Sequence, residues 1–130
     1  MSKKTAQKAT FDDLINKKLQ KEVNQNKTID IYISSMDRTI TFKKPSDDNM
    51  LDAIDEIGDN KNNKTVVNAY KKLIYKTCDM FQDSKLHEAL EVVDPFDTVD
   101  KIFDLDDITE IGDQLLDSDN IQKKYNQIKN

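Results

Sequence analysis

The side chains best suited to catalysis are those of one histidine and one cysteine, His87 and Cys78. A histidine can act as a general base and a cysteine thiolate as a nucleophile, but catalysis needs further groups arranged around them. No serine lies in the glycine pattern of a nucleophile elbow, and Cys78 falls on the apolar face of a predicted helix. We therefore expect His87 at the surface or at a helix end and Cys78 as a small buried residue. We predict that the protein is not an enzyme.

Carboxylates form the second group that could do chemistry. Residues 104–112 begin with the alternating oxygen ligands of a calcium loop, but Ile108 and Thr109 stand where an EF-hand has an oxygen ligand and a glycine. Carboxylate pairs elsewhere fit helix N-termini and solvated faces; they are Asp47 with Asp48 and Asp52 with Glu56. The chain has no zinc ligand set and no phosphate-binding glycine loop. We expect no metal and no cofactor.

The N-terminal third shows the periodicities of one helix and two strands. Residues 10–25 place apolar side chains at helical spacing behind Thr10, a residue type that caps helices. These apolar residues are Phe11, Leu14, Ile15, Leu19 and Val23. The predicted helix either lies on the core or presents its apolar face to a partner. Residues 28–33 and 39–42 are β-branched, alternating runs, which predict a β-hairpin with one apolar face.

The following segments predict helices. Ser46 begins a capping sequence, and Gly58 ends the apolar repeat that follows it. Residues 66–81 keep the helical repeat throughout and should form the central core helix. Shorter helices are predicted at residues 84–93, 94–103 and 106–117.

Length and composition fit one small helical domain. A chain of 130 residues suffices for a single core. Its 36% hydrophobic and 35% charged residues predict a thin core, and only two glycines and two prolines argue against a turn-rich β-sandwich. We predict an α+β fold, mainly α, in which an N-terminal helix and one β-hairpin accompany a bundle of about four to five helices.

The predicted organisation has three parts. Residues 1–9 form a flexible basic N-terminus, residues 10–117 a single α+β domain, and residues 118–130 a polar tail or frayed helix. The chain contains no apolar run typical of a secretory signal or a membrane span, and its lone cysteine cannot form an internal disulfide. We expect a cytoplasmic protein that does not bind a membrane.

Charge is distributed unevenly along the chain. Residues 79–120 hold fourteen acids and two lysines, whereas residues 1–78 hold fifteen bases and eleven acids. Apolar residues interleave with the acids, so this half suits a basic, apolar partner segment. We predict that partner binding uses Val92, Phe96, Val99, Phe103, Ile108, Ile111 and Leu115. The alternative is that these residues complete the core beneath an acidic, solvated exterior.

Basic residues near the N-terminus raise the question of nucleic-acid binding. They are Lys3, Lys4, Lys8, Lys17, Lys18 and Lys21. The chain carries a net charge of -5, so a solvated helix face explains these lysines better than a phosphate-binding stripe, and we expect no nucleic-acid partner. The opposite arrangement remains open, in which the acidic half acts as a regulator or nucleic-acid mimic that occupies a basic groove on a partner protein.

The order of these features resembles that of the XkdN-like tail assembly chaperones, found in siphophages, myophages and related phage-like elements of Gram-positive bacteria. The resemblance covers roughly residues 28–117 and includes the hairpin that ends in FKKP at residues 42–45. It is strongest in the NAYKKLI stretch at residues 68–74 and the LEVVDPFD run at residues 90–97, which is followed by VDKIF at residues 99–103.

The resemblance implies a non-enzymatic protein that acts early in tail assembly, in the cytoplasm of the bacterial host. Its implied partner is the tape measure protein, a long helical protein that it would hold until tail tube subunits polymerise around it. The tail tube protein is a second implied partner, and self-association into a homo-oligomer remains open. An acidic protein with apolar grooves is suited to shielding a long, aggregation-prone helix reversibly.

Overall fold

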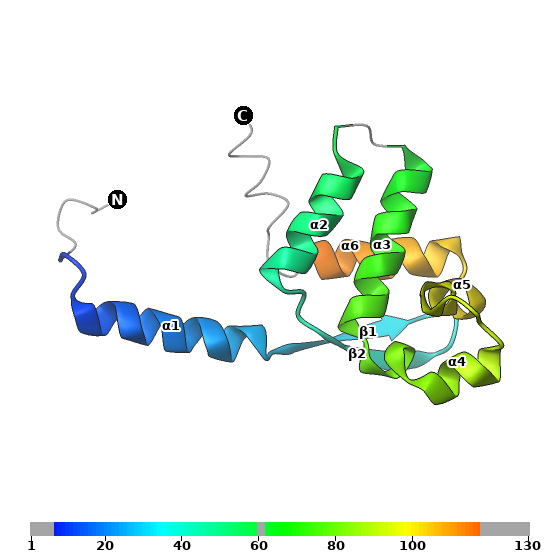
Figure 1. The fold of residues 1–130 in the computed structure, drawn as a ribbon, viewed down its shortest axis with the longest axis horizontal. Coiled ribbons are helices and arrows are strands. Elements are labelled where there is room, and N and C mark those ends of the chain that lie inside the picture. Colours follow the sequence, from blue (N-terminus) through cyan, green and yellow to red (C-terminus); the bar gives the residue numbers. More distant parts are fainter. Residues whose placement is uncertain (1–6, 60–61, 118–130) are drawn as a thin grey trace.

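The computed structural model describes residues 7–59 and 62–117. In these residues the α-helices are α1 (Phe11–Gln25), α2 (Asp47–Ile57), α3 (Asn63–Thr77), α4 (Ser84–Leu90), α5 (Thr98–Ile102) and α6 (Leu105–Asp117). The strands are β1 (Thr28–Ile33) and β2 (Arg38–Lys43), and two 3-10 helices are η2 (Asp79–Gln82) and η3 (Pro95–Asp97). The predicted fold class is confirmed, because one hairpin packs against a bundle formed by α2 to α6 (Figure 1).

The hairpin has the predicted apolar face. β1 and β2 are antiparallel, with Ile31 opposite Ile40 and Ile29 opposite Phe42. Ile31 and Phe42 are completely buried on the side that faces the helices. The opposite side is polar, and there the Thr41 hydroxyl donates to the Asp30 carboxylate at 2.7 Å. One face of the ribbon therefore belongs to the core and the other to solvent.

The predicted boundaries of α2 are confirmed. The Ser46 hydroxyl accepts a hydrogen bond from the Asn49 backbone N–H at 3.1 Å, which satisfies one free donor at the start of the helix. Gly58 ends the helix with a positive φ of 57°, a conformation that glycine adopts without strain. Residues 60–61, in the predicted loop that follows, lie outside the described residues.

The central helix α3 is shorter than predicted. It ends at Thr77 and does not continue to Phe81, because Cys78 takes an extended conformation (φ -121°, ψ 111°). The chain then turns through η2, which brings the Phe81 ring to 5.5 Å from the Phe103 ring in the core. Packing of Phe81 against a remote element therefore replaces the last predicted turn of the helix.

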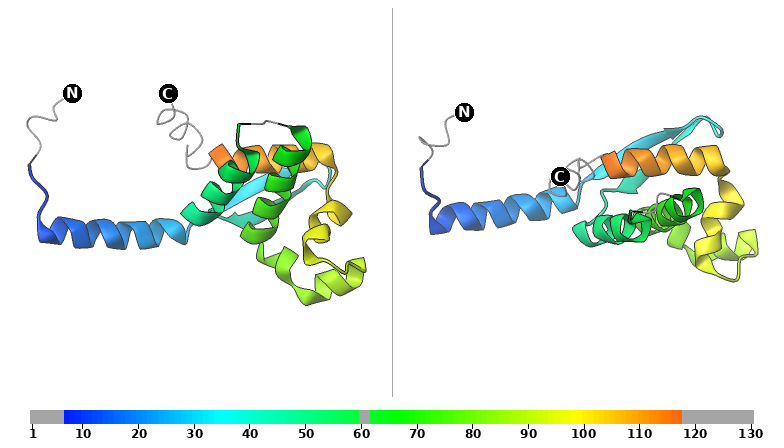
Figure 2. Two further views of the ribbon diagram at one scale, coloured as in Figure 1. Left: turned by 45° about the horizontal axis from the view of Figure 1, so that its top comes forward. Right: turned by 90° about the horizontal axis from the view of Figure 1, so that it is seen from above.

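Helix α6 connects the two halves of the core. It packs against α3 on one side and β1 on the other, and the views from two directions show it between them (Figure 2). Gly112 permits the close approach to α3, because a Cβ atom there would lie 2.2 Å from the Tyr70 ring. The Tyr70 hydroxyl then donates to the Asp113 carboxylate at 2.6 Å.

The acidic segment between η2 and α6 is less helical than predicted. The helix predicted at residues 84–93 ends at Leu90, because Glu91 adopts a left-handed conformation with φ 58°. The helix predicted at residues 94–103 is divided into η3 and the short α5, whereas the one predicted at residues 106–117 is present as α6. These short elements pack across the end of the bundle nearest the hairpin turn (Figure 1).

Candidate functional site

Helix α1 extends away from the body of the molecule (Figures 1 and 2). None of its residues is buried. It is joined to the body at its C-terminal end, where the Lys44 N–H donates to the Lys27 carbonyl at 2.9 Å just after the helix. The Lys21 ammonium also lies 3.8 Å from the Asp47 carboxylate, although both side chains are mostly exposed and such a pair contributes little. The described core thus begins at the hairpin, inside the predicted domain at residues 10–117.

The start of α1 is held by a capping box. The Asp13 N–H donates to the Thr10 hydroxyl at 3.2 Å, and the Thr10 N–H donates to the Asp13 carboxylate at 2.8 Å. These hydrogen bonds hold the pKa of Asp13 below its ordinary value of 3.8, and the bond from the Thr10 backbone has the largest effect. Local interactions therefore support a helix that tertiary packing does not cover.

Five exposed apolar side chains form a continuous row on α1, which we call the α1 stripe. They are Phe11, Leu14, Ile15, Leu19 and Val23, with exposed fractions of 77%, 64%, 43%, 50% and 63%. Single exposed apolar residues are ordinary on a protein surface, but a contiguous apolar row on one helix marks an interaction surface. The residues at 11, 15, 19 and 23 form a ridge with a spacing of four, the geometry that packs into the groove of a crossing helix.

The predicted partner-binding surface in the acidic half is largely core. Of its seven residues, five are buried; they are Val99, Phe103, Ile108, Ile111 and Leu115, each at most 4% exposed. The prediction that these five face a partner is wrong for the folded chain, because α3 and β1 already cover their apolar faces. The alternative interpretation, that they complete the core beneath an acidic exterior, describes them correctly.

The other two predicted partner-binding residues remain accessible. Val92 is half-buried, and Phe96 is 43% exposed. The Phe96 ring packs against Tyr75 with 4.9 Å between ring centroids, so part of its surface supports the fold. Val92 lies in the loop after α4 and Phe96 in η3, so the two do not form a stripe comparable with that on α1.

His87 and Cys78 both have structural surroundings. The His87 Nε2 lies 2.5 Å from the Phe81 carbonyl oxygen, and its ring stacks on Tyr75 with 6.1 Å between centroids. Cys78 is 1% exposed, and this burial raises the pKa of its thiol above the ordinary value. A buried thiol with a raised pKa forms little thiolate and is a poor nucleophile. These contacts agree with the predicted structural role of each residue.

Acidic residues of the calcium-like stretch cap α6. The Asp107 N–H donates to the Asp104 carboxylate at 3.0 Å, and the Asp104 N–H donates to Asp107 at 3.3 Å. These reciprocal bonds are a capping box, in which each carboxylate satisfies a free backbone donor. Among the described residues, no three acidic, histidine or cysteine side chains gather as a metal site would require.

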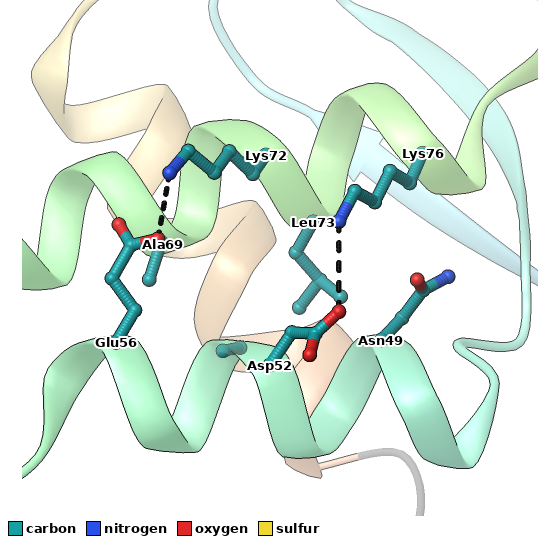
Figure 3. A pocket seen from close by; sticks show the side chains of 8 residues that line it. Asn49, Asp52, Glu56, Ala69, Lys72, Leu73 and Lys76 are labelled. Atoms are coloured by element: carbon teal, nitrogen blue, oxygen red, sulfur yellow. Dashed lines mark hydrogen bonds and ion pairs between the residues drawn. The ribbon is translucent and has the colours of Figure 1, made fainter.

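A polar hollow between α2 and α3 contains the other predicted carboxylate pair (Figure 3). The Lys72 ammonium lies 2.8 Å from Glu56, and the Lys76 ammonium lies 3.9 Å from Asp52. The two carboxylates therefore point at lysines of the neighbouring helix and not at each other (Figure 3). This hollow of about 300 Å³ contains two partly exposed ion pairs between helices, which contribute little stability and do not resemble a general acid and base pair.

Comparison with known proteins gives no relative for the chain: no family model, no curated protein and no solved structure matches it. None of the helices in the described residues is long and apolar enough to cross a bilayer. Among the described surfaces, the α1 stripe is the candidate site for binding.

Proposed function

We propose that the protein is a non-enzymatic assembly factor that binds another protein through the α1 stripe. The observation that carries this proposal is the amphipathic helix α1, which is capped and formed while its apolar face remains exposed. In its specific form, the protein is a phage tail assembly chaperone. It binds the tape measure protein, and also tail tube subunits, during tail assembly. The resemblance at residues 68–74 and 90–103 supports that form.

The α1 stripe is large enough for reversible binding. Each of its five side chains exposes between 43% and 77% of its surface, so covering it would stabilise a complex by about 1–2 kcal/mol per side chain before the costs of association. The capping box lowers the free energy that a partner must supply to order the helix. A sum of this size suits a factor that must later release its partner.

The geometry of the stripe favours a helical partner. A ridge with a spacing of four packs into another helix at a crossing angle of about -50°, which produces a local contact and not a long coiled coil. Lys18 lies at the edge of the ridge and favours an acidic group beside the partner's apolar residues. A long helical protein offers many such sites, so several copies could cover it in succession.

Co-expression tests the specific proposal. The protein should raise the soluble fraction of the tape measure protein encoded beside it, and Ile15→Asp with Leu19→Asp should remove this effect. The matched control is Asn16→Asp with Gln20→Asp, which adds the same charge with the same spacing one residue further along the exposed helix. Loss of solubility in both double variants, or in neither, would contradict a role for the α1 stripe.

The acidic exterior supports a second candidate, a regulator that occupies a basic groove of a partner protein. Of the acids from Asp79 to Asp113, all except the buried Asp107 are exposed. Such a protein should displace nucleic acid from its partner, and the displacement should weaken strongly as salt rises. The same Ile15→Asp and Leu19→Asp variant would keep this activity, which separates it from the first proposal.

A further inference from the structure

A second apolar surface lies at the opposite end of the hairpin from α1. We call it the hairpin groove, and its apolar lining is Met36, Ile40, Met80, Phe81, Leu86 and Ile102. The groove has a volume of about 520 Å³. Ile40 and Phe81 form a buried floor, whereas Met36 and Met80 are 44% and 57% exposed at its edges. Methionine side chains adapt their shape, so such edges suit an inserted apolar side chain.

Helix α1 does not fill the hairpin groove of its own chain in this structure. It ends at Gln25, with two residues between it and β1, and points away from the body (Figures 1 and 2). The groove lies beyond the far end of β1, by the turn that contains Met36, so the six-residue strand separates the two by roughly 20 Å.

Charge complements shape in a contact between two copies. Residues 1–27, which include α1, carry seven lysines and three acids. The groove is built partly on η2, α4 and α5, which belong to the acidic segment at residues 79–120 with its fourteen acids and two lysines. Helix α1 itself holds three lysines and three acids, so the excess of positive charge lies beside it in the N-terminal segment. Asp83 and Arg38 both border the groove, and the wider acidic segment gives the surrounding surface its negative charge. The positively charged N-terminal segment of one copy is therefore attracted to the acidic half of another.

We propose that the α1 stripe of one copy docks in the hairpin groove of a second copy. The ridge of the helix inserts side chains such as Ile15 and Leu19 between Met36 and Met80, and Lys18, at the edge of the ridge, lies toward the acidic elements around the groove. This inference concerns the free protein and does not depend on the proposed chaperone function. A helical client would compete with the second copy for the same stripe.

The contact joins two different surfaces, which determines how copies assemble. If each copy inserts its α1 into the other, the contact closes as a two-fold exchange dimer; if not, it continues from copy to copy as a chain. Both forms contain the same docking contact. They differ in stoichiometry, which sedimentation velocity distinguishes.

Complementary variants test the docking contact. The stripe variant combines Ile15→Asp with Leu19→Asp, and the groove variant combines Met36→Asp with Met80→Asp at exposed positions. The native chain should associate as its concentration rises, whereas each variant alone should sediment as a monomer. An equimolar mixture of the two variants should associate again, because one copy retains the helix and the other retains the groove.

The remaining outcomes overturn the proposal. Association of the groove variant alone would mean that α1 pairs with another α1, and association of the stripe variant alone would mean that a different surface joins the copies. A native chain that stays monomeric at all concentrations would mean that α1 does not dock on a second copy. The control combines Leu51→Asp with Val93→Asp, which adds equal charge at exposed apolar positions outside the groove and should not change association.

A cross-link gives a second measurement that does not depend on affinity. The native Cys78 is 1% exposed, so a thiol introduced at the surface reacts selectively. Copies with Lys18→Cys, mixed with copies with Asp83→Cys, should give a mixed dimer with a short bis-maleimide. Equal yields from Lys18→Cys with Glu56→Cys, a site on the distant α2, would contradict docking at the groove.

Discussion

Helices α1 and α6 are both amphipathic, but the apolar face of α6 is buried and that of α1 is exposed. Both place apolar residues on one face and acids in the first turn. In α6 the apolar residues Ile111, Leu115 and Leu116 are at most 2% exposed, whereas no residue of α1 is buried. The difference shows that amphipathic spacing records a need for a covering surface and does not identify that surface.

The covering surface of α6 comes from residues remote in sequence. Tyr70 of α3 lies over Gly112 and bonds to Asp113, 43 positions further along the chain. α1 has no such opposite surface within the described chain, so its N-terminal capping box takes the place of tertiary support. Helix α6 therefore belongs to the stability of the fold, and α1 belongs to its interactions.

The largest expected loss of stability comes from truncating a buried leucine in α6, and the matched truncation of an exposed leucine in α1 should have little effect. Leu115→Ala in α6 should lower the free energy of unfolding by about 2–5 kcal/mol, because it leaves a cavity at a fully buried site. Leu19→Ala in α1 should change it by less than about 0.5 kcal/mol. Urea unfolding followed by circular dichroism measures both, and equal losses would mean that α1 packs on the body in solution.

A smaller loss should follow Gly112→Ala, which tests the close contact that covers α6. The added methyl group would meet the Tyr70 ring, so overpacking should cost about 1–3 kcal/mol, partly offset by the higher helix propensity of alanine. Gln114→Ala, on the exposed side of α6, is the control and should be nearly neutral. Combining Gly112→Ala with Tyr70→Ala should be less than additive, and strict additivity would place the clash elsewhere.

Thr10→Ala should weaken α1 without weakening the core. Removal of the hydroxyl that accepts from the Asp13 N–H should destabilise the helix by about 1 kcal/mol. Amide hydrogen exchange should therefore accelerate over residues 11–25, while protection in α6 stays unchanged. Parallel loss of protection in both helices would show that they unfold as one unit.

The smallest effect concerns pH and again separates α1 from the core. Because the pKa of Asp13 is lowered in the folded chain, its contribution to the cap is complete above the ordinary value of 3.8 and is lost as pH falls through the lowered pKa. NMR titration should show Asp13 titrating at lower pH than it does in the Thr10→Ala variant. The variant keeps the Thr10 backbone N–H, the larger cause of the lowered pKa, so the outcome that contradicts the capping interpretation is a midpoint at or above 3.8 in the native chain.

Local signals in the sequence predicted much of the fold. Alternation between Ile31 and Ile33 predicted the buried face of β1, and Ser46 and Gly58 predicted both ends of α2. In each case the residues that determine the structure are neighbours in the chain. The prediction was wrong where remote packing prevails, as at Cys78, where the chain leaves the helical path and Phe81 reaches the ring of Phe103.

The candidate site was predicted only in part. The acidic half was correctly identified as apolar and charged, but five of its proposed contact residues lie in the core. For residues 10–25 the spacing predicted an amphipathic helix and left open whether it covers the core or waits for a partner. The hairpin groove gave no sequence signal, because it assembles β2, η2, α4 and α5 from distant positions.

The amino-acid sequence by itself determined the helix caps, the apolar face of the hairpin and the existence of two apolar helix faces. These depend on hydrogen bonds and side-chain spacing within a few residues. Only the tertiary structure decided which apolar face is buried, because burial requires a matching surface that the chain must bring from far away. Helix α6 meets that surface in α3 and β1, and α1 extends into solvent with its stripe uncovered.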